Sequence, residues 1–389
     1  MRSCLVVGMP KSGTSVLYSS IKKALDNPYC LFEPGYLYQL ENINMISGRD
    51  RLCKTLYGID KLGIENFNIF DRKIHIVRDP RDILVSYVLY WPLLKERYRN
   101  KKYIDVLHDA FLKKEGDPES VSLLDIIRIH NNFGYSFISS RNLQSGLAAS
   151  KNIDERLSDV FVLKYDDLVD KNTQNLNQYL GFEIDINVKV GEHISFNHRE
   201  GGNGGWRHWF TDEDVYHFNN ILIPYIVRYD FSLDWTVIRG RGKYINPNSA
   251  SGYLQRSVDK LSKYPQSNGL LRDDVEYNAS YHEHLISALS DGIESAAIEL
   301  ALMNLFGIYL RQDKDQYEKM LRDYARRGNP TALVHLGVAF GFNLISIGNG
   351  ETESECYRRA SLLRGKRAVI RQIQSIKMFY ERYLNLLVK

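Results

Sequence analysis

The feature that most constrains the fold is a short segment near the beginning of the chain. An apolar run at residues 4–7 ends at Gly8, and apolar residues recur at helical spacing from Leu17 to Leu25. Residues 8–14, Gly-Met-Pro-Lys-Ser-Gly-Thr, therefore join a buried strand to the first turn of a helix. The unpaired N–H groups and the positive dipole end of such a helix attract an anion, and Lys11 adds a full positive charge. The segment predicts a binding site for phosphate or a similar group.

This loop differs from the loop of P-loop nucleoside triphosphatases. In those proteins a lysine directly follows the second glycine, and a Ser or Thr comes next to hold magnesium. Here Thr14 follows Gly13, and the lysine lies inside the loop. Glycine-containing junctions between a strand and a helix are common, so the loop alone leaves open whether it binds phosphate.

Strand-like and helix-like segments alternate through the first half of the chain. Apolar runs predict strands at residues 29–32, 51–56, 73–77 and 159–165. After the third run, Asp79 can cap a helix and Pro80 suits its first turn. The alternation predicts an α/β fold with a parallel sheet flanked by helices, and a functional site along the carboxyl edge of that sheet.

Length and composition limit the class of protein. The chain has 389 residues, of which 44% are hydrophobic and 25% are charged, enough for two or three globular domains. The net charge of +4 is too small to indicate a nucleic-acid partner. The four cysteines show no C-x-x-C spacing, which favours a reducing compartment. We expect neither a signal peptide nor a membrane-spanning stretch. We therefore expect a cytoplasmic protein without a membrane span.

The second half of the chain has a different pattern. We expect a first domain at residues 1–238, a connector rich in Gly, Asn, Ser and Pro at 239–275, and an all-α region at 276–389. Stretches that begin at Ala297 and Ala332 resemble each other at a period of 35 residues. Such a pattern is typical of tetratricopeptide or Sel-type repeats, and an ordinary helical bundle fits it as well. These helices are candidates for binding a protein partner or a second copy of the chain.

Three separated motifs stand out in the first domain. They are the loop at residues 8–15, the segment Arg-Asp-Pro-Arg-Asp-Ile-Leu-Val-Ser at 78–86, and the glycine- and tryptophan-containing segment at 199–211. In this order they resemble the 5′-phosphosulfate loop, the 3′-phosphate motif and the C-terminal R-K-G-x-x-G-D-W-K-N-x-F-T segment of sulfotransferases that use 3′-phosphoadenosine 5′-phosphosulfate (PAPS). The resemblance covers about residues 3–235. It implies a P-loop-like three-layer α/β fold and a PAPS donor, with no metal expected.

The resemblance also implies which residues hold the donor. The loop would hold the phosphosulfate, whereas the planar guanidinium of Arg78 and the hydroxyl of Ser86 would hold the 3′-phosphate. A tyrosine at the position of Tyr165 meets the adenine in relatives, and Val16 occupies the place of another stacking aromatic residue. The expected donor-binding residues are Pro10, Lys11, Ser12, Gly13, Thr14, Ser15, Arg78, Ser86, Tyr165, Arg199, Glu200 and Gly201.

Each of these assignments has a structural alternative. Arg78 could pair with Asp82, four residues along the same helix, and Ser86 could be an ordinary hydroxyl on a helix surface. Residues 201–205 could be a plain surface loop, and Tyr165 a core residue. The basic and aromatic run at 91–103 could guide a sulfated or acidic glycan, or it could be a solvated face.

Three residues are candidates for the chemical step. Lys11 can neutralise the bridging oxygen of the donor, and Lys54 corresponds to a lysine at the donor site of many relatives. Enzymes that act on phenols and steroids place a His where this chain has Leu56, which cannot accept a proton. Carbohydrate-directed and many bacterial members instead carry a Glu in a Phe-Glu-Pro setting, matched here by Glu33, which implies Glu33 as the general base. The alternative is that Glu33 is a structural partner of a lysine or of helix N–H groups.

The sequence therefore predicts a sulfotransferase that acts on a hydroxyl group, with a carbohydrate as the expected acceptor. Two alternatives stay open. A P-loop kinase of a small alcohol would bind ATP with magnesium. A non-catalytic nucleotide-binding module would use its helical region to bind a protein and would transfer nothing.

Overall fold

The structure is a computed structural model in which the chain packs as two compact units. The first unit comprises Met1–Gly35 and Gly48–Pro265, and the second comprises Tyr36–Ser47 and Gln266–Lys389. The structure describes residues 1–25, 28–34, 40, 43–44, 48, 50–135, 140–187, 203–239, 245–262, 286, 289–290, 294–306, 312–345, 352–364 and 366–387.

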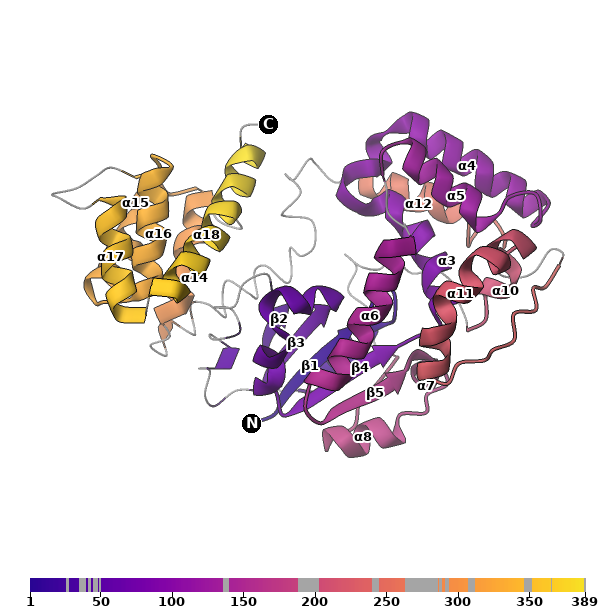
Figure 1. Ribbon diagram of the computed structural model, residues 1–389, viewed down its shortest axis with the longest axis horizontal. Coiled ribbons are helices and arrows are strands. Elements are labelled where there is room, and N and C mark those ends of the chain that lie inside the picture. The colour runs from indigo at the N-terminus through magenta and orange to yellow at the C-terminus, as the bar shows by residue number, and fades with distance from the viewer. Residues whose placement is uncertain are drawn as a thin grey trace. The chain divides into compact units, whose positions relative to one another are not determined.

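The first unit is built on a parallel sheet. Among the described residues it has five strands, in the order β2-β3-β1-β4-β5 (Figure 1). All six residues of the central strand are buried, as expected for a parallel strand that is covered on both faces. The strands are β1 (Ser3–Gly8), β2 (Tyr29–Phe32), β3 (Arg51–Leu56), β4 (Arg72–Val77) and β5 (Val160–Lys164). The predicted α/β fold class is confirmed, and every predicted strand is present.

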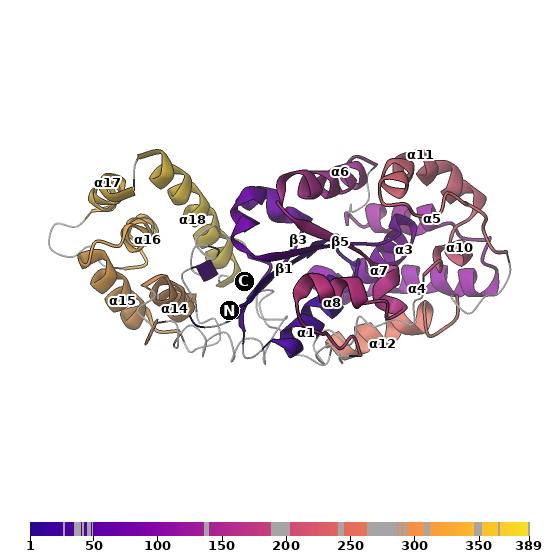
Figure 2. The ribbon, with the colours of Figure 1, turned by 90° about the horizontal axis from the view of Figure 1, so that it is seen from below.

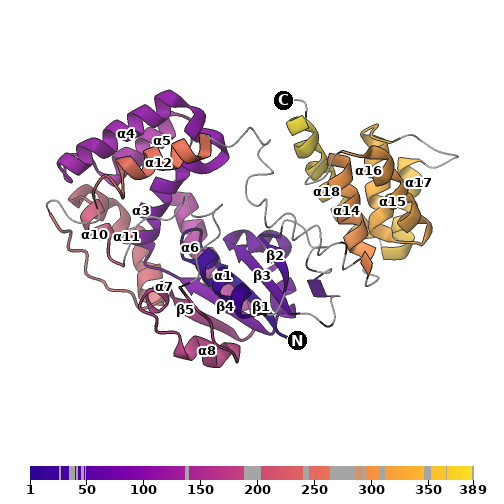
Figure 3. The same cartoon turned by 180° about the vertical axis from the view of Figure 1, so that it is seen from behind.

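Helices cover both faces of this sheet. The helices α1 (Thr14–Ala24) and α8 (Gln174–Leu180) lie on one face, and α6 (Ser140–Arg156) crosses the other (Figures 2 and 3). The helix α3 (Pro80–Tyr90) follows β4, and the Asp79 side chain accepts a hydrogen bond of 2.9 Å from the Arg81 backbone N–H. The predicted helix start at Asp79 and Pro80 is therefore confirmed.

Further helices form a second layer beside the sheet, around an aromatic-rich core. Apart from this layer, η1 (Tyr57–Leu62) and η2 (Ile64–Ile69) contact α6, and α7 (Tyr165–Val169) follows β5. The helices of the layer are η3 (Trp91–Arg99), α4 (Lys101–Gly116), α5 (Leu123–Asn132), α10 (Trp206–Trp209), α11 (Asp212–Arg228) and α12 (Ser251–Ser262). The last of these lies within the range 239–275, where we expect a connector. Tyr253 and Leu254 of α12 are buried in the core of the first unit.

A closed ring of polar contacts lies between the sheet and the helices α6 and α11. His75 Nδ1 is 2.6 Å from an Asp154 carboxylate oxygen, and His75 Nε2 is 2.8 Å from the Tyr57 hydroxyl. Tyr57 donates to Ser150 at 2.9 Å, the Ser150 and Tyr229 hydroxyls are 2.6 Å apart, and Tyr229 donates to Asp154 at 2.6 Å. The ring joins four elements of the fold. His75 and Ser150 are fully buried, so a substrate cannot reach the ring.

Acid should weaken this ring. Burial raises the pKa of Asp154, but hydrogen bonds from His75, Tyr229 and Arg228 outweigh burial and leave that pKa below its usual value. The carboxylate therefore stabilises the fold above the unfolded pKa of about 3.9, and the stabilisation is lost as pH falls through the lower folded pKa. We expect Asp154→Asn to lower the free energy of unfolding by about 2 kcal/mol at neutral pH. This difference should shrink as the pH falls below about 4.

Urea unfolding followed by circular dichroism at a series of pH values measures that difference. Glu155→Gln, at a half-exposed position next along α6, is the matched control and should show little change at any pH. If Asp154→Asn lowered the unfolding free energy by the same amount at acidic and at neutral pH, the ring would not depend on an ionised Asp154.

The second unit is all α-helical within the residues that the structure describes, as predicted for the C-terminal region. Consecutive helices pack against each other, and α16 also contacts α18. A buried hydrogen bond of 2.6 Å joins the Tyr317 and Tyr380 hydroxyls. The helices are α14 (Glu294–Phe306), α15 (Lys314–Arg326), α16 (Pro330–Gly341), α17 (Glu353–Arg364) and α18 (Lys366–Leu387). Their assignment to a repeat family stays a prediction. Across the described parts of both units, no helix combines the length and apolar character needed to cross a membrane.

Candidate functional site

The predicted site residues that the structure describes gather along the carboxyl edge of the sheet. All paired strands are parallel, so the segments that follow them leave from the same edge. Glu33 follows β2, Arg78 follows β4 and Tyr165 follows β5, while Lys54 lies near the end of β3. The loop at residues 9–13 follows β1. The connections after β1 and β4 lead to opposite sides of the sheet, and such a reversal is where ligands bind in open α/β folds.

The loop after β1 presents the start of α1 without a side-chain cap. Gly13 occupies the N-cap position with φ of 100°, and the first turn of the helix contains no acidic residue. Ser12 is fully buried and donates to the Met9 carbonyl at 2.8 Å, which shapes the turn. A Cβ atom at Gly13 would lie 2.5 Å from the Tyr165 ring, so only glycine fits this approach. The uncapped N–H groups of α1 can therefore receive an anion.

Arg78 joins this loop to the end of β4. Its Nη1 donates to the Lys11 carbonyl at 3.1 Å, and its guanidinium lies 4.3 Å from the centre of the Tyr165 ring. The residue is 6% exposed, and its Nε has no hydrogen-bond partner among the residues that the structure describes. A buried, partly unsatisfied guanidinium beside an uncapped helix start is suited to a phosphate. The Lys11 ammonium lies 4.2 Å from the centre of the Tyr90 ring.

The Tyr165 ring supports Arg78 in this structure and packs against Gly13. Its role in adenine stacking stays a prediction. The next residue, Asp166, has one buried carboxylate oxygen without a partner among the described residues. Burial, together with the charges of Asp82 and Asp79, raises the pKa of Asp166 to about 6. A carboxyl group beside Arg78 can thus change its protonation state close to neutral pH.

Glu33 and Lys54 form an ion pair at the outer part of the same edge. The Glu33 backbone N–H donates to the Lys54 carbonyl at 2.7 Å, continuing the pairing of β2 with β3. The Lys54 side chain is 4% exposed and the Glu33 side chain is 41% exposed, so the carboxylate is the member that a substrate can reach. The alternative in which Glu33 pairs with a lysine is realised, and its role as a base stays a prediction.

Ser86 lies on the least buried face of α3. Eight of the eleven residues of this helix are buried, and Ser86, Tyr87 and Tyr90 are only partly buried. Since Tyr90 contacts Lys11, this face borders the loop after β1. The position suits a hydroxyl that meets a ligand, and the phosphate contact of Ser86 stays a prediction.

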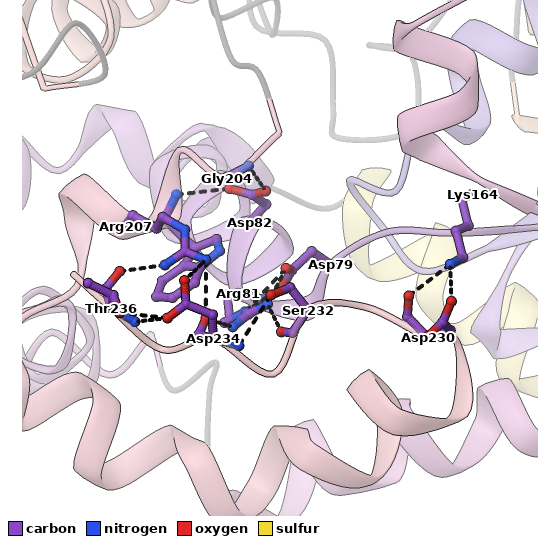
Figure 4. A network of polar contacts seen from close by, with 11 residues as sticks. Asp79, Arg81, Asp82, Lys164, Gly204, Arg207, Asp230, Ser232, Asp234 and Thr236 are labelled. Atoms are coloured by element: carbon purple, nitrogen blue, oxygen red, sulfur yellow. Dashed lines mark hydrogen bonds and ion pairs between the residues drawn. The ribbon is translucent and has the colours of Figure 1, made fainter. Parts of the chain in front are cut away.

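The third motif lies partly outside the described residues. Arg199, Glu200 and Gly201 fall in that part, so their contacts are not described. The following residues are held by Asp82, whose carboxylate accepts hydrogen bonds from Gly204 N–H at 2.8 Å and Trp206 N–H at 2.9 Å (Figure 4). Asp82, the alternative partner of Arg78, thus ties the second motif to the third. Burial raises the pKa of Asp82, although Arg78 and both hydrogen bonds favour the carboxylate.

Arg81 holds the same region together from the inside. Its side chain is 1% exposed and lies over the rings of Trp206, at 4.1 Å, and Trp235, at 4.8 Å. The guanidinium pairs with both oxygens of Asp79 and donates to the carbonyls of Ser232 at 2.7 Å and Asp234 at 2.9 Å (Figure 4). This cluster fixes the start of α3, and with it the position of Arg78.

Sequence reasoning did not assign roles to Arg81 and Asp166, and it considered Asp82 only as a partner of Arg78. A signal for Arg81 and Asp82 was present in the segment Arg-Asp-Pro-Arg-Asp, which crowds four charges at the end of a buried strand. Charges at such a place need specific partners. Arg81 has a local partner in Asp79, but the Gly204 N–H that donates to Asp82 and the Asp234 carbonyl that accepts from Arg81 lie more than 120 residues away, where no local pattern points to them.

The chain has a distant likeness to solved structures. No family model matches the chain, and no curated protein matches it. Among solved structures, the chain is similar to the crystal structure of mouse sulfotransferase SULT7A1 complexed with PAP, with a TM-score of 0.39 and 16% sequence identity. The match covers 59% of this chain and 86% of the mouse chain. At this TM-score the likeness carries no weight for ligand or reaction.

Proposed function

We propose that the first unit is a sulfotransferase that moves a sulfuryl group from PAPS to a hydroxyl group of a carbohydrate. The observation that carries the proposal is the meeting of the uncapped start of α1 with the buried guanidinium of Arg78, through the hydrogen bond from Arg78 to the Lys11 carbonyl. Two anion-binding groups on neighbouring strands suit a donor that carries negative charge at both ends.

Each part of the site receives one task in this proposal. The loop from Pro10 to Ser15 binds the phosphosulfate, and Arg78 with Ser86 binds the 3′-phosphate, joined by Arg199, Glu200 and Gly201. Tyr165 contacts the adenine. In the reaction, a bond forms between the acceptor oxygen and sulfur, and the bond from sulfur to the bridging phosphate oxygen breaks, which releases adenosine 3′,5′-bisphosphate. Lys11 stabilises the negative charge that develops on that bridging oxygen.

Glu33 accepts the proton that leaves the acceptor hydroxyl, and Lys54 holds the Glu33 carboxylate in place through their ion pair. The same pair keeps the base oriented at the sheet edge before the acceptor binds. Lys54 is thereby a positioning residue for Glu33 and is not needed as a second lysine at the donor.

We also propose a division of the chain around this activity. Residues 1–238 form the transferase domain, 239–275 connect it to the rest, and the helices within 276–389 present the acceptor or bind a protein partner or a second copy. The proposed setting is the cytoplasm, with no metal required. A limited proteolysis map tests the division.

Nucleotide binding without metal is the direct test. We expect adenosine 3′,5′-bisphosphate to raise the thermal midpoint of the protein in the presence of a chelator, because a ligand at a hundred times its dissociation constant adds about 2.7 kcal/mol. ATP with magnesium is the comparison. Stabilisation by magnesium and ATP alone would favour the kinase alternative, and no response to either nucleotide would count against a nucleotide site.

Glu33→Gln should lower the rate of sulfuryl transfer about 10²- to 10⁴-fold, because amide nitrogen and oxygen cannot accept the proton. Binding of adenosine 3′,5′-bisphosphate should stay unchanged. Transfer is measured with radiolabelled PAPS and a panel of saccharides, and binding by calorimetry. Glu183→Gln is the matched control, since Glu183 is exposed and lies beyond α8, away from the site edge. Transfer that survives Glu33→Gln would remove Glu33 from the mechanism, and nucleotide binding with no transfer by the native protein would favour the non-catalytic module.

A further inference from the structure

An aromatic row runs along α3 and η3 from the loop lysine to Arg97. Lys11 lies over the Tyr90 ring, and the rings of Tyr87 and Trp91 are 5.6 Å apart. The guanidinium carbon of Arg97 lies 3.8 Å from the centre of the Trp91 ring. The row begins on the partly exposed face of α3 that also carries Ser86. The aromatic row therefore extends from Lys11, at the expected transfer site, to the positive charge of Arg97.

Arg97 is held in place by uncharged groups. It donates to the Trp91 carbonyl at 3.1 Å and lies 5.3 Å from the centre of the Tyr135 ring, so its plane is fixed between two aromatic rings. Within the described part of the chain, no carboxylate acts on its charge. Burial lowers the pKa of Arg97 from its usual value.

The titratable groups that act on the charge of Arg97, among the residues that the structure describes, are the hydroxyls of Tyr87, Tyr103 and Tyr135 and the ring of His130. Burial and the charge of Arg97 lower the pKa of His130 to about 3, so that ring is neutral at physiological pH. A fixed, half-buried guanidinium among neutral rings gains most from an anion supplied by a ligand.

We propose that Arg97 is a specificity-determining residue that binds an anionic substituent, a carboxylate or a sulfate, on the carbohydrate acceptor. The sugar ring lies on the aromatic row, with the reacting hydroxyl toward Lys11 and the anionic substituent at Arg97. Aromatic faces suit the apolar side of a sugar ring, and the guanidinium edge suits a planar or tetrahedral anion. The inference rests on the proposed function and adds the class of acceptor to it.

The test uses three disaccharides with the same rings and different charge: cellobiose, its 6-sulfate, and the corresponding uronic acid. Binding to the full-length protein is measured by calorimetry in the presence of saturating adenosine 3′,5′-bisphosphate. We expect the anionic members to bind about 10- to 100-fold more tightly than cellobiose, as hydrogen bonds to a charged group allow. The two anionic members distinguish a carboxylate from a sulfate preference.

Arg97→Gln should remove this preference without changing the affinity for cellobiose or for the nucleotide, and Arg97→Lys should retain part of it. Arg99→Gln makes the same charge change at an exposed position in the same segment and should have no effect. Because Arg97→Gln could impair folding, the native protein alone also tests the inference. If it bound all three disaccharides equally, or bound none of them, the inference would be overturned. If a folded Arg97→Gln protein bound the nucleotide more weakly, the aromatic row would belong to the donor site, and this result would also overturn the inference. Failure of the proposed function is distinguished by a separate measurement, because in that case the native protein would not bind the nucleotide.

Discussion

Replacing Arg78 with alanine is expected to weaken the binding of adenosine 3′,5′-bisphosphate about 10²- to 10⁴-fold, while the protein stays folded. Two hydrogen bonds from a guanidinium to a phosphate, at about 1.5–3 kcal/mol each, account for this range. The substitution also removes the contact with the Lys11 carbonyl, so the loop after β1 loses a support at the same time. Both losses act on the same ligand.

Calorimetric titration of the nucleotide into each purified variant measures the effect. Arg72→Ala is the matched control, because Arg72 is an exposed arginine at the opposite end of the same strand. Arg78→Lys keeps the charge but loses the planar fork, and it should fall between the native protein and the alanine variant. Equal affinities of the Arg78→Ala and Arg72→Ala proteins would remove Arg78 from the binding site and would take the main support from the proposed function.

Substituting Arg81 by methionine is expected to cost about 3–5 kcal/mol of unfolding free energy, the range seen when one partner of a buried ion pair is removed. The change leaves the Asp79 carboxylate and the carbonyls of Ser232 and Asp234 without their buried donor. Methionine can still contact the rings of Trp206 and Trp235. The lost unfolding free energy therefore reports mainly on the polar contacts of Arg81 and not on its packing.

Urea unfolding gives this free energy. Arg128→Met is the control for loss of an arginine in a salt bridge, because its side chain is 59% exposed and its pairs should contribute less than about 1 kcal/mol. Arg81→Lys provides a milder change in case the methionine variant does not accumulate. If Arg81→Lys and Arg128→Met lowered the unfolding free energy equally, the cluster around Arg81 would be no more than a surface ion pair in energetic terms.

The sheet was predictable because its signals are local. Each strand is an apolar run with a turn signal at its end, and the start of α3 is visible in the adjacent pair Asp79 and Pro80. The uncapped loop is likewise visible in a few neighbouring residues. Such features depend on short-range backbone preferences, which can be predicted from a single sequence.

The rest of the site depends on contacts between distant residues. The pairing of Glu33 with Lys54 follows from the register of β2 on β3, which no local pattern encodes. Asp82 looked like a partner for Arg78 because residues four apart meet on a helix, yet its carboxylate accepts from backbone N–H groups more than 120 residues away. Backbone donors carry no sequence signature. The composition of 239–275 indicates a connector, whereas the apolar side chains of α12 within it are buried in the core.

The hydrogen bonds of Asp82 and Arg81 also have a consequence for the order of folding. They join residues separated by 122 and 153 positions, so closing them requires the chain to have been made through residue 234. A nascent chain that ends at residue 187 would contain the loop, the five strands that the structure describes and Arg78. The start of α3 would have its local cap from Asp79 but would lack the long-range contacts of Asp82 and Arg81. The anion-binding edge is thus completed only after residues 204–234 have been synthesised, and long-range closure of this kind is a slow step in folding.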